Sequence, residues 1–145
     1  LARAAGAATV LHSLPGRNDT VRLGLDALLG ECPGLGGCIF LPGDQPLLRR
    51  ESLEAMVRDF HAQKETERVI LRLGWRAGGA EPLLGSPVLF GSGHFDALRA
   101  LPEGKGGGVV IRQHPGCVRA VYAQSAEELE DADTVERLEA LKRFL

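Results

Sequence analysis

The hydrophobic positions of the chain follow two periods, one typical of helices and one typical of buried strands. Apolar residues spaced three and four apart predict two amphipathic helices, one that begins near Asn18-Asp19-Thr20 and one over residues 51–62. Their apolar faces comprise Val21, Leu25, Leu28 and Leu29 in the first helix, and Leu53, Met56, Val57 and Phe60 in the second. The continuous apolar run 38–41 is typical of a strand that is covered on both faces.

Strands and helices are expected to alternate along the chain. Residues 109–114 suit either a strand, because they include β-branched residues, or a short helix that follows glycines. A last helix is expected to follow a capping-box pattern over 133–136, with Asp133 as the capping residue and Glu136 three residues later. Further strands are expected at 7–12, 68–73, 87–90 and 118–122, with a short helix after Ser92. This alternation predicts a layered α/β fold with a mainly parallel sheet.

The composition is that of one ordinary globular domain. The 145 residues carry a formal net charge of −2, so the chain has no basic surface of the kind that binds nucleic acid. It contains no apolar run of about 18 residues, so we expect no membrane span. The three cysteines form no Cys-x-x-Cys pair, which argues against a disulfide framework or structural zinc and favours a cytoplasmic location. Residues 1–6 look like the end of a helix, which suggests that a segment precedes them.

Asp44 is the first candidate for chemistry. It follows the predicted strand 38–41 on a Pro-Gly turn, and ligands of open α/β sheets bind at the carboxyl ends of strands. Mg²⁺ prefers oxygen ligands and often binds one or two carboxylates together with substrate phosphates. The alternative is a turn aspartate whose side chain bonds only to its own backbone.

Asp131 and Asp133, just before the last helix, are the second candidates. Asp133 has a structural alternative as a helix cap, which makes Asp131 the better candidate for a metal ligand. We expect only one of the two to contact a given ion. Whether either acid meets Asp44 cannot be deduced from spacing.

The glycine cluster 104–108 is expected to be a flexible turn. It lacks the Gly-x-x-x-x-Gly-Lys-Ser/Thr order of a phosphate-binding loop, and no Ser or Thr follows Lys105.

Taken together, four segments resemble the MobA/MocA-like molybdenum-cofactor nucleotidyltransferases. They are Leu41-Pro-Gly-Asp-Gln-Pro46, Gly85-Ser-Pro-Val-Leu-Phe90, the segment 98–107 and Asp131-Ala-Asp-Thr134. The resemblance implies a Rossmann-like nucleotidyltransferase fold, similar to glycosyltransferase type A, in the form of a three-layer sandwich. It also implies transfer of CMP or GMP from CTP or GTP to molybdopterin, with Mg²⁺ as cofactor and release of pyrophosphate.

The resemblance also assigns roles to residues. Asp44 would be the catalytic residue and a Mg²⁺ ligand, and Asp131 or Asp133 would be the second acidic contact. Asp19, Thr20 and Arg22 would lie beside the nucleotide. Gly85, Ser86 and Pro87 would border the acceptor site. A molybdenum hydroxylase, or its maturation factor, is the implied protein partner.

Two departures from the family pattern limit what we expect of these 145 residues. The family's triphosphate loop, Gly-x-x-x-Arg-Met-Gly-x-x-Lys, is absent, and the C-terminal motif lacks its usual proline and one acid. We therefore expect residues 1–145 to be the C-terminal two-thirds of a single domain, truncated at its N-terminus and inactive on its own. The alternative function is a non-catalytic binding module that keeps the α/β core.

Overall fold

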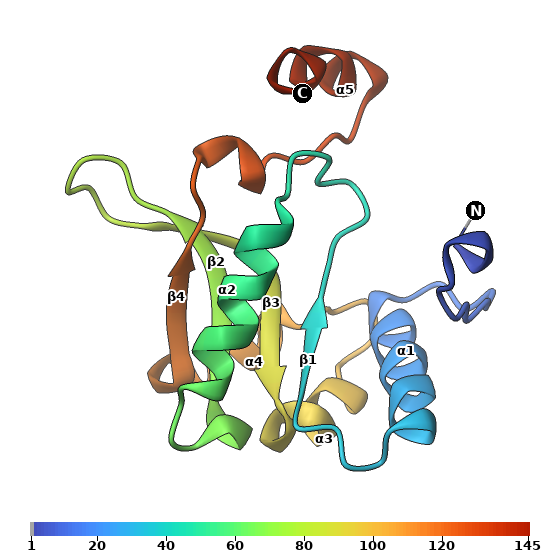
Figure 1. Cartoon of the computed structure of the whole chain (residues 1–145). Helices are drawn as coiled ribbons and strands as arrows, with labels where there is room; N and C mark the ends of the chain where they lie inside the picture. The colour runs from blue at the N-terminus through green and yellow to red at the C-terminus, as the bar shows by residue number, and fades with distance from the viewer. Residues whose placement is uncertain (1) are drawn as a thin grey trace.

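A four-stranded sheet forms the centre of the computed structural model, which describes residues 2–145 (Figure 1). Its strands lie in the order β1 (Gly37–Phe40), β3 (Leu83–Gly91), β2 (Ile70–Trp75) and β4 (Val118–Tyr122). β3 is antiparallel to both β1 and β2, and β4 is parallel to β2. β1, β2 and β4 therefore point the same way, and their carboxyl ends lie at one edge of the sheet.

The reversed strand β3 is the main difference from the predicted sheet. Three of the four strands share one direction, but β3 is inserted between β1 and β2, so two of the three pairings are antiparallel. The hairpin loop 76–82 accounts for the antiparallel pairing of β2 with β3, because strands joined in this way run in opposite directions. The pairing of β3 with the distant strand β1 completes its insertion. Gly78 and Gly79 take positive φ angles of 51° and 89° in that loop.

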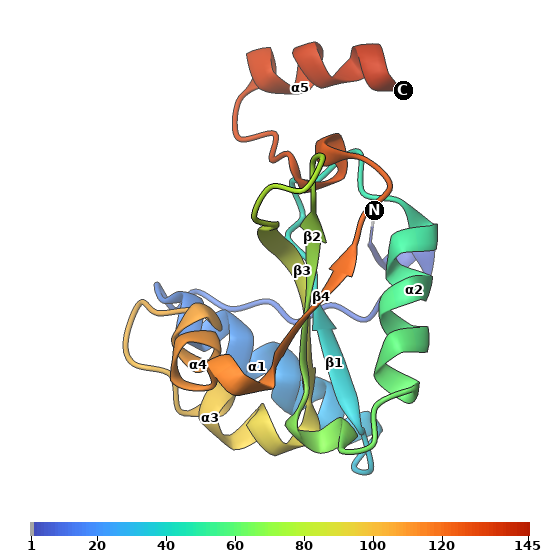
Figure 2. The ribbon, with the colours of Figure 1, turned by 90° about the vertical axis from the view of Figure 1, so that its left-hand side faces the viewer.

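Helices cover both faces of the sheet, which confirms the predicted three layers (Figure 2). α2 (Arg50–His61) lies on one face, and α1 (Arg17–Glu31), α3 (Phe95–Arg99) and α4 (Gly108–Gln113) lie on the other. Each face has its own core. The cluster on the α1 side includes Leu25, Ile70, Phe90, Leu98 and Val110, and that on the α2 side includes Met56, Phe60, Leu71, Leu73 and Leu89.

The predicted helical faces are largely confirmed. Leu25 and Met56 are fully buried, whereas Leu28 and Val57 remain 44% and 42% exposed at the margins of their helices. The ambiguous segment 109–114 is helical, because α4 covers residues 108–113. The 118–122 strand is confirmed as β4, and the strand expected at 87–90 is the second half of the longer β3.

The predicted strand at 7–12 is wrong. These residues have no regular structure and pair with no strand, and Leu11 is 87% exposed. Without a neighbouring strand, an apolar extended segment has no partner for its backbone groups, so its composition alone cannot make it a strand. In the predicted helix end at 1–6, Arg3–Ala5 form a single 3₁₀ turn, and Leu1 lies outside the described residues.

The capping residue of the last helix also differs from the prediction. α5 (Val135–Leu141) is capped by Thr134, whose hydroxyl accepts a hydrogen bond from the Arg137 N–H at 3.1 Å. Asp133 lies one position before the cap. The expected capping role of Asp133 is therefore wrong, and its carboxylate is available for another purpose.

The state of the cysteines and the lengths of the helices agree with what the composition predicted. All three cysteines are free thiols, and burial raises the pKa of the Cys38 thiol, as expected for a core residue. Among residues 2–145, no helix has the length and apolarity needed to cross a membrane.

We expect copies of this chain to associate through the outer edge of β1. Among residues 2–145, β1 pairs with β3 alone, so the expectation of a strand covered on both faces at 38–41 is wrong. An apolar groove lined by residues such as Ile39, Val57 and Leu89 runs beside β1. Open strand edges with apolar surroundings promote pairing between chains. We expect association that increases with protein concentration in sedimentation velocity, and Val57→Lys should reduce it by placing a charge in the groove.

The matched control is Val135→Lys, which makes the same change on α5 at a residue that is 71% exposed. It should leave association unchanged. A native chain that stays monomeric at high concentration would contradict this account of the edge.

Candidate functional site

The two acidic segments singled out in the sequence meet at the carboxyl edge of the sheet. Asp44 lies in the loop between β1 and α2, and Asp131 and Asp133 lie between β4 and α5; both segments run at the same end of the sheet (Figure 1). The Ala132 N–H donates a hydrogen bond of 2.8 Å to the Asp44 carbonyl oxygen. The backbone therefore holds Asp131 and Asp133, on either side of Ala132, beside the Asp44 loop.

The carboxylates of all three acids are open to solvent. Asp44, Asp131 and Asp133 are exposed, whereas Ala132 between the last two is half-buried. This alternation places Asp131 and Asp133 on the same side of the segment, as residues two apart in an extended chain are. Their placement therefore gives no reason why only one of them could reach a given ion.

The acids do not form a closed metal site by themselves. Within residues 2–145, no group of three or more His, Cys, Asp or Glu side chains has the arrangement of a metal site. The arrangement instead offers carboxylates from two loops, and the other coordination positions around a bound cation would face solvent. Such a site suits a cation that takes its other ligands from water or from a substrate.

Gln45 connects the Asp44 loop to β3. Its Nε2 donates a hydrogen bond of 3.3 Å to the Ser86 carbonyl oxygen. Its Oε1 is buried and has no hydrogen-bond partner among the described residues, so it is an acceptor that water or a ligand could satisfy. The predicted acceptor segment 85–87 is thus held directly against the predicted metal loop.

A cavity of about 480 Å³ lies on the α1 face of the sheet and reaches this edge. It brings together Thr20 and Ser86, two predicted site residues, with Arg17 and Arg72, which the sequence analysis did not select. The rest of its wall is mainly apolar or glycine, formed by Val21, Phe40, Leu41, Pro42, Val88, Phe90, Leu98, Gly106, Gly107, Gly108 and Ile111. The volume is within the range of small-molecule sites.

Arg72 is the most distinctive residue of the cavity. Its Nε donates to the Gly85 carbonyl oxygen at 3.3 Å, and its Nη2 donates to the Leu84 carbonyl oxygen at 3.0 Å. Burial lowers the pKa of Arg72 from its ordinary value, because the apolar surroundings disfavour the charge. A partly buried cation in an apolar wall attracts an anionic ligand group.

One feature of the sequence does point to Arg72. Arg72 is the one charged residue in the buried strand Ile70–Trp75, and a charge within a strand covered on both faces needs a specific partner or a specific purpose. Arg17 carried no such signal, since a basic residue after Pro15-Gly16 is ordinary on a helix surface.

The other predicted residues are near the cavity but do not line it. The carboxylate of Asp19 accepts a hydrogen bond from the Gly16 N–H at 3.3 Å and pairs with Arg22 at 3.2 Å, so both residues stabilise the start of α1. Gly85 and Pro87 flank Ser86 in β3. A nucleotide contact for Asp19 and Arg22 stays a prediction.

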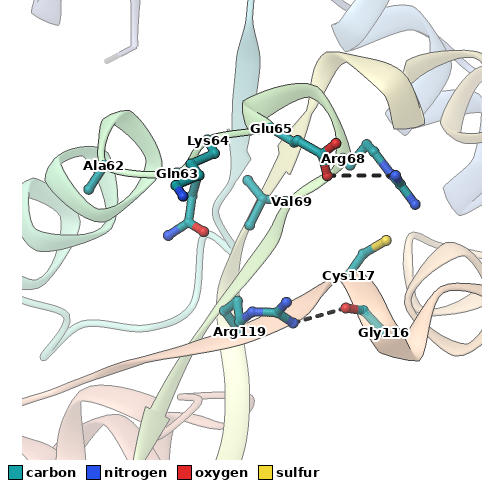
Figure 3. A pocket seen from close by; sticks show the side chains of 9 residues that line it. All are labelled: Ala62, Gln63, Lys64, Glu65, Arg68, Val69, Gly116, Cys117 and Arg119. Carbon is teal, nitrogen blue, oxygen red and sulfur yellow. Dashed lines mark hydrogen bonds and ion pairs between the residues drawn. The ribbon is translucent and has the colours of Figure 1, made fainter.

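A second and larger cavity, of about 650 Å³, lies at the amino ends of β2 and β4 (Figure 3). Lys64, Arg68 and Arg119 give it a basic character, but two of these cations have neighbouring partners. Arg68 pairs with Glu65 at 3.6 Å, and Arg119 donates to the Gly116 and Val118 carbonyl oxygens at 2.9 Å each. None of the predicted site residues lines this cavity, so the carboxyl edge is the candidate site.

Two solved structures have a similar fold. Rv0371c from Mycobacterium tuberculosis H37Rv is 24% identical, with a TM-score of 0.73 over 97% of this chain and 69% of that one. Its homolog from Mycobacterium sp. strain JC1 is 20% identical, with a TM-score of 0.63 over 93% of this chain and 63% of that one. Among curated proteins, no sequence matches this chain significantly.

The sequence also matches a family model. The model of the MobA-like NTP transferase domain covers residues 2–120, which include Asp44, the cavity and all four strands up to Ala120. Asp131 and Asp133 lie beyond the match. The domain is of the nucleotidyltransferase type, with nucleoside triphosphates as the substrates that it implies. The chain therefore belongs to the family of MobA-like NTP transferase domains.

Proposed function

We propose that this chain carries the metal-binding and acceptor-binding parts of a nucleotidyltransferase that joins CMP or GMP to molybdopterin. The nucleotide would come from CTP or GTP, pyrophosphate would leave, and Mg²⁺ would be the cofactor. The observation that carries the proposal is the meeting of Asp44 with Asp131 and Asp133 beside a cavity that contains two arginines. A cytoplasmic molybdenum hydroxylase, or its maturation factor, would receive the product.

The donor set at the edge fits Mg²⁺. Mg²⁺ commonly binds one or two carboxylates and leaves its other positions to water and substrate phosphates. Asp44 and one or both of Asp131 and Asp133 offer such carboxylates on exposed loops. When bound, Mg²⁺ would neutralise charge on the phosphate groups that react.

The cavity fits an acceptor that has a flat apolar body and an anionic group. Phe40, Phe90 and Ile111 offer apolar contact, and Arg17 and Arg72 offer cations to a phosphate. Molybdopterin combines a fused ring system with a phosphate monoester, which is the group that receives the nucleotide. Arg72 is held by two carbonyl oxygens before any ligand arrives, so little reorganisation is needed for it to orient that phosphate.

A non-catalytic binding module is the second candidate. It is favoured by the absence from these 145 residues of the sequence Gly-x-x-x-Arg-Met-Gly-x-x-Lys, which would grip a triphosphate. Both candidates bind the acceptor, but the second has no turnover even when a triphosphate-binding loop is supplied.

Incubation with labelled CTP or GTP, Mg²⁺ and molybdopterin tests whether residues 1–145 suffice for turnover. We expect the chain alone to bind molybdopterin but to release no pyrophosphate, because residues 1–145 contain no match to the Gly-x-x-x-Arg-Met-Gly-x-x-Lys loop, whose backbone N–H groups and cations would hold a triphosphate. Sustained pyrophosphate release by the monomer would show that another segment binds the triphosphate.

Asp44→Asn tests the metal site. Mn²⁺ serves as the probe, since it prefers the same oxygen ligands and its free form is measured by electron paramagnetic resonance. Loss of one carboxylate charge should weaken Mn²⁺ binding by about tenfold or more, equivalent to about 1.4 kcal/mol. Molybdopterin binding and the circular dichroism spectrum should not change. The matched control is Asp59→Asn on α2, and Mn²⁺ affinity equal to native in Asp44→Asn would contradict the assignment.

Asp131→Ala and Asp133→Ala identify the second acidic contact. The variant that weakens Mn²⁺ binding identifies the contact, and we expect little change in the melting temperature for either variant because neither residue caps α5. Thr134→Ala should instead cost about 1 kcal/mol of stability, because Thr134 is the helix cap, and should leave Mn²⁺ binding unchanged. Native Mn²⁺ affinity in both variants would contradict a second acidic contact from this segment.

A further inference from the structure

The Glu128 carboxylate is buried in the segment that leads from β4 to the acids of the candidate site. It lies in a 3₁₀ turn, Ala126–Leu129, and is only 1% exposed. An ionised carboxylate is costly to bury unless hydrogen bonds replace its water. Glu128 has three such bonds, which come from the Ser52 hydroxyl at 2.5 Å, the Gln124 N–H at 3.0 Å and the Arg49 N–H at 3.3 Å.

Two of these three donors, from Arg49 and Ser52, lie at the start of α2, directly after the loop that carries Asp44. Arg49 is the N-cap residue of α2 and ends the loop that carries Asp44, and Ser52 lies in the first turn of the same helix. The Arg49 guanidinium adds a longer ion pair, with its Nε 4.0 Å from the carboxylate. Glu128 therefore anchors the start of α2 to the segment after β4.

Segments 44–49 and 128–132 are thus joined at both ends. One junction is the hydrogen bond from the Ala132 N–H to the Asp44 carbonyl oxygen, and the other is the Glu128 carboxylate against Arg49 and Ser52. With both junctions closed, the positions of Asp44 and Asp131 relative to each other are fixed. Loss of one junction removes part of this constraint.

We propose that Glu128 is a positioning residue, which sets the distance between Asp44 and Asp131 without touching the metal or the substrate. The functional part of this statement rests on the proposed metal site. The carboxylate has three acceptor contacts to make, and Gln at this position would present an N–H₂ group to at least one of the same donors. Glu128→Gln keeps the size of the side chain but removes the negative charge, which strengthens the bonds from Arg49 and Ser52 and attracts the Arg49 guanidinium. It should therefore weaken the second junction.

The test has one readout that depends on the metal site and one that does not. In the full chain, Glu128→Gln should weaken Mn²⁺ binding by about tenfold, through the altered spacing of the carboxylates. It should also speed amide hydrogen exchange at Ala132 by about tenfold, because the Ala132–Asp44 bond opens more often when its neighbouring junction is lost. Ser52→Ala, which removes one of the three donors, should shift both quantities the same way by a smaller factor.

Val110→Ala is the control for general loss of stability. Val110 is 1% exposed on α4, in the core on the opposite face of the sheet. It should lower the melting temperature but leave Mn²⁺ affinity and the relative exchange rate at Ala132 within about twofold of native.

The two readouts separate the possible failures. If the native chain binds no Mn²⁺ at this edge, the proposed metal site fails, and faster exchange at Ala132 in Glu128→Gln still supports the positioning role. If Glu128→Gln and Ser52→Ala lower the melting temperature yet leave exchange at Ala132 as in Val110→Ala, then Glu128 is only a stabilising core residue and the proposal is overturned.

Discussion

The hydrogen bond between the Ala132 N–H and the Asp44 carbonyl oxygen is the interaction on which the candidate site depends. It joins two segments that are far apart in the sequence and that each carry exposed carboxylates. Because backbone groups make this bond, replacement of the Asp44, Asp131 or Asp133 side chain leaves it in place. The fold thus separates the framework of the edge, made by the main chain and Glu128, from the side chains that would bind a ligand.

The reversed strand β3 is the second constraint, and it shapes the cavity. β3 lies between β1 and β2, so its Leu84 and Gly85 carbonyl oxygens come within reach of the Arg72 guanidinium on β2. These bonds compensate part of the cost of taking a cation out of water. The same strand carries Ser86, whose carbonyl oxygen holds Gln45 of the Asp44 loop. One strand therefore connects the arginine in the cavity to the acidic loop.

Much of this fold could be predicted from local patterns, since amphipathic faces and short apolar runs are properties of the segments themselves. Leu25, Met56 and Phe60 are buried as their spacing indicates, and β4 matches its predicted range. The failures arose where the outcome depends on a distant partner. Residues 7–12 have the composition of a strand but no strand beside them, and the insertion of β3 depends on sheet order, which no local pattern contains.

The candidate site likewise has parts that local patterns predict and parts that depend on distant partners. The position of Asp44 was predictable because the loop that follows a strand lies at the carboxyl edge of an α/β sheet, and this holds although β1 is a half-buried edge strand and not the covered one that was predicted. That Asp131 and Asp133 lie beside it was not predictable, because this depends on a backbone bond between loops. The place of Arg17 in the cavity could not be predicted from the sequence either, because it depends on the packing of α1 against the sheet.

The most direct test of the central claim is anomalous diffraction from crystals of the chain grown with Mn²⁺ and molybdopterin. The account predicts an anomalous peak between the Asp44 loop and the 131–133 segment, with the molybdopterin phosphate near Arg72. An ordered Mn²⁺ elsewhere on the molecule, with no peak at this edge in crystals where both acidic segments are free, would contradict it.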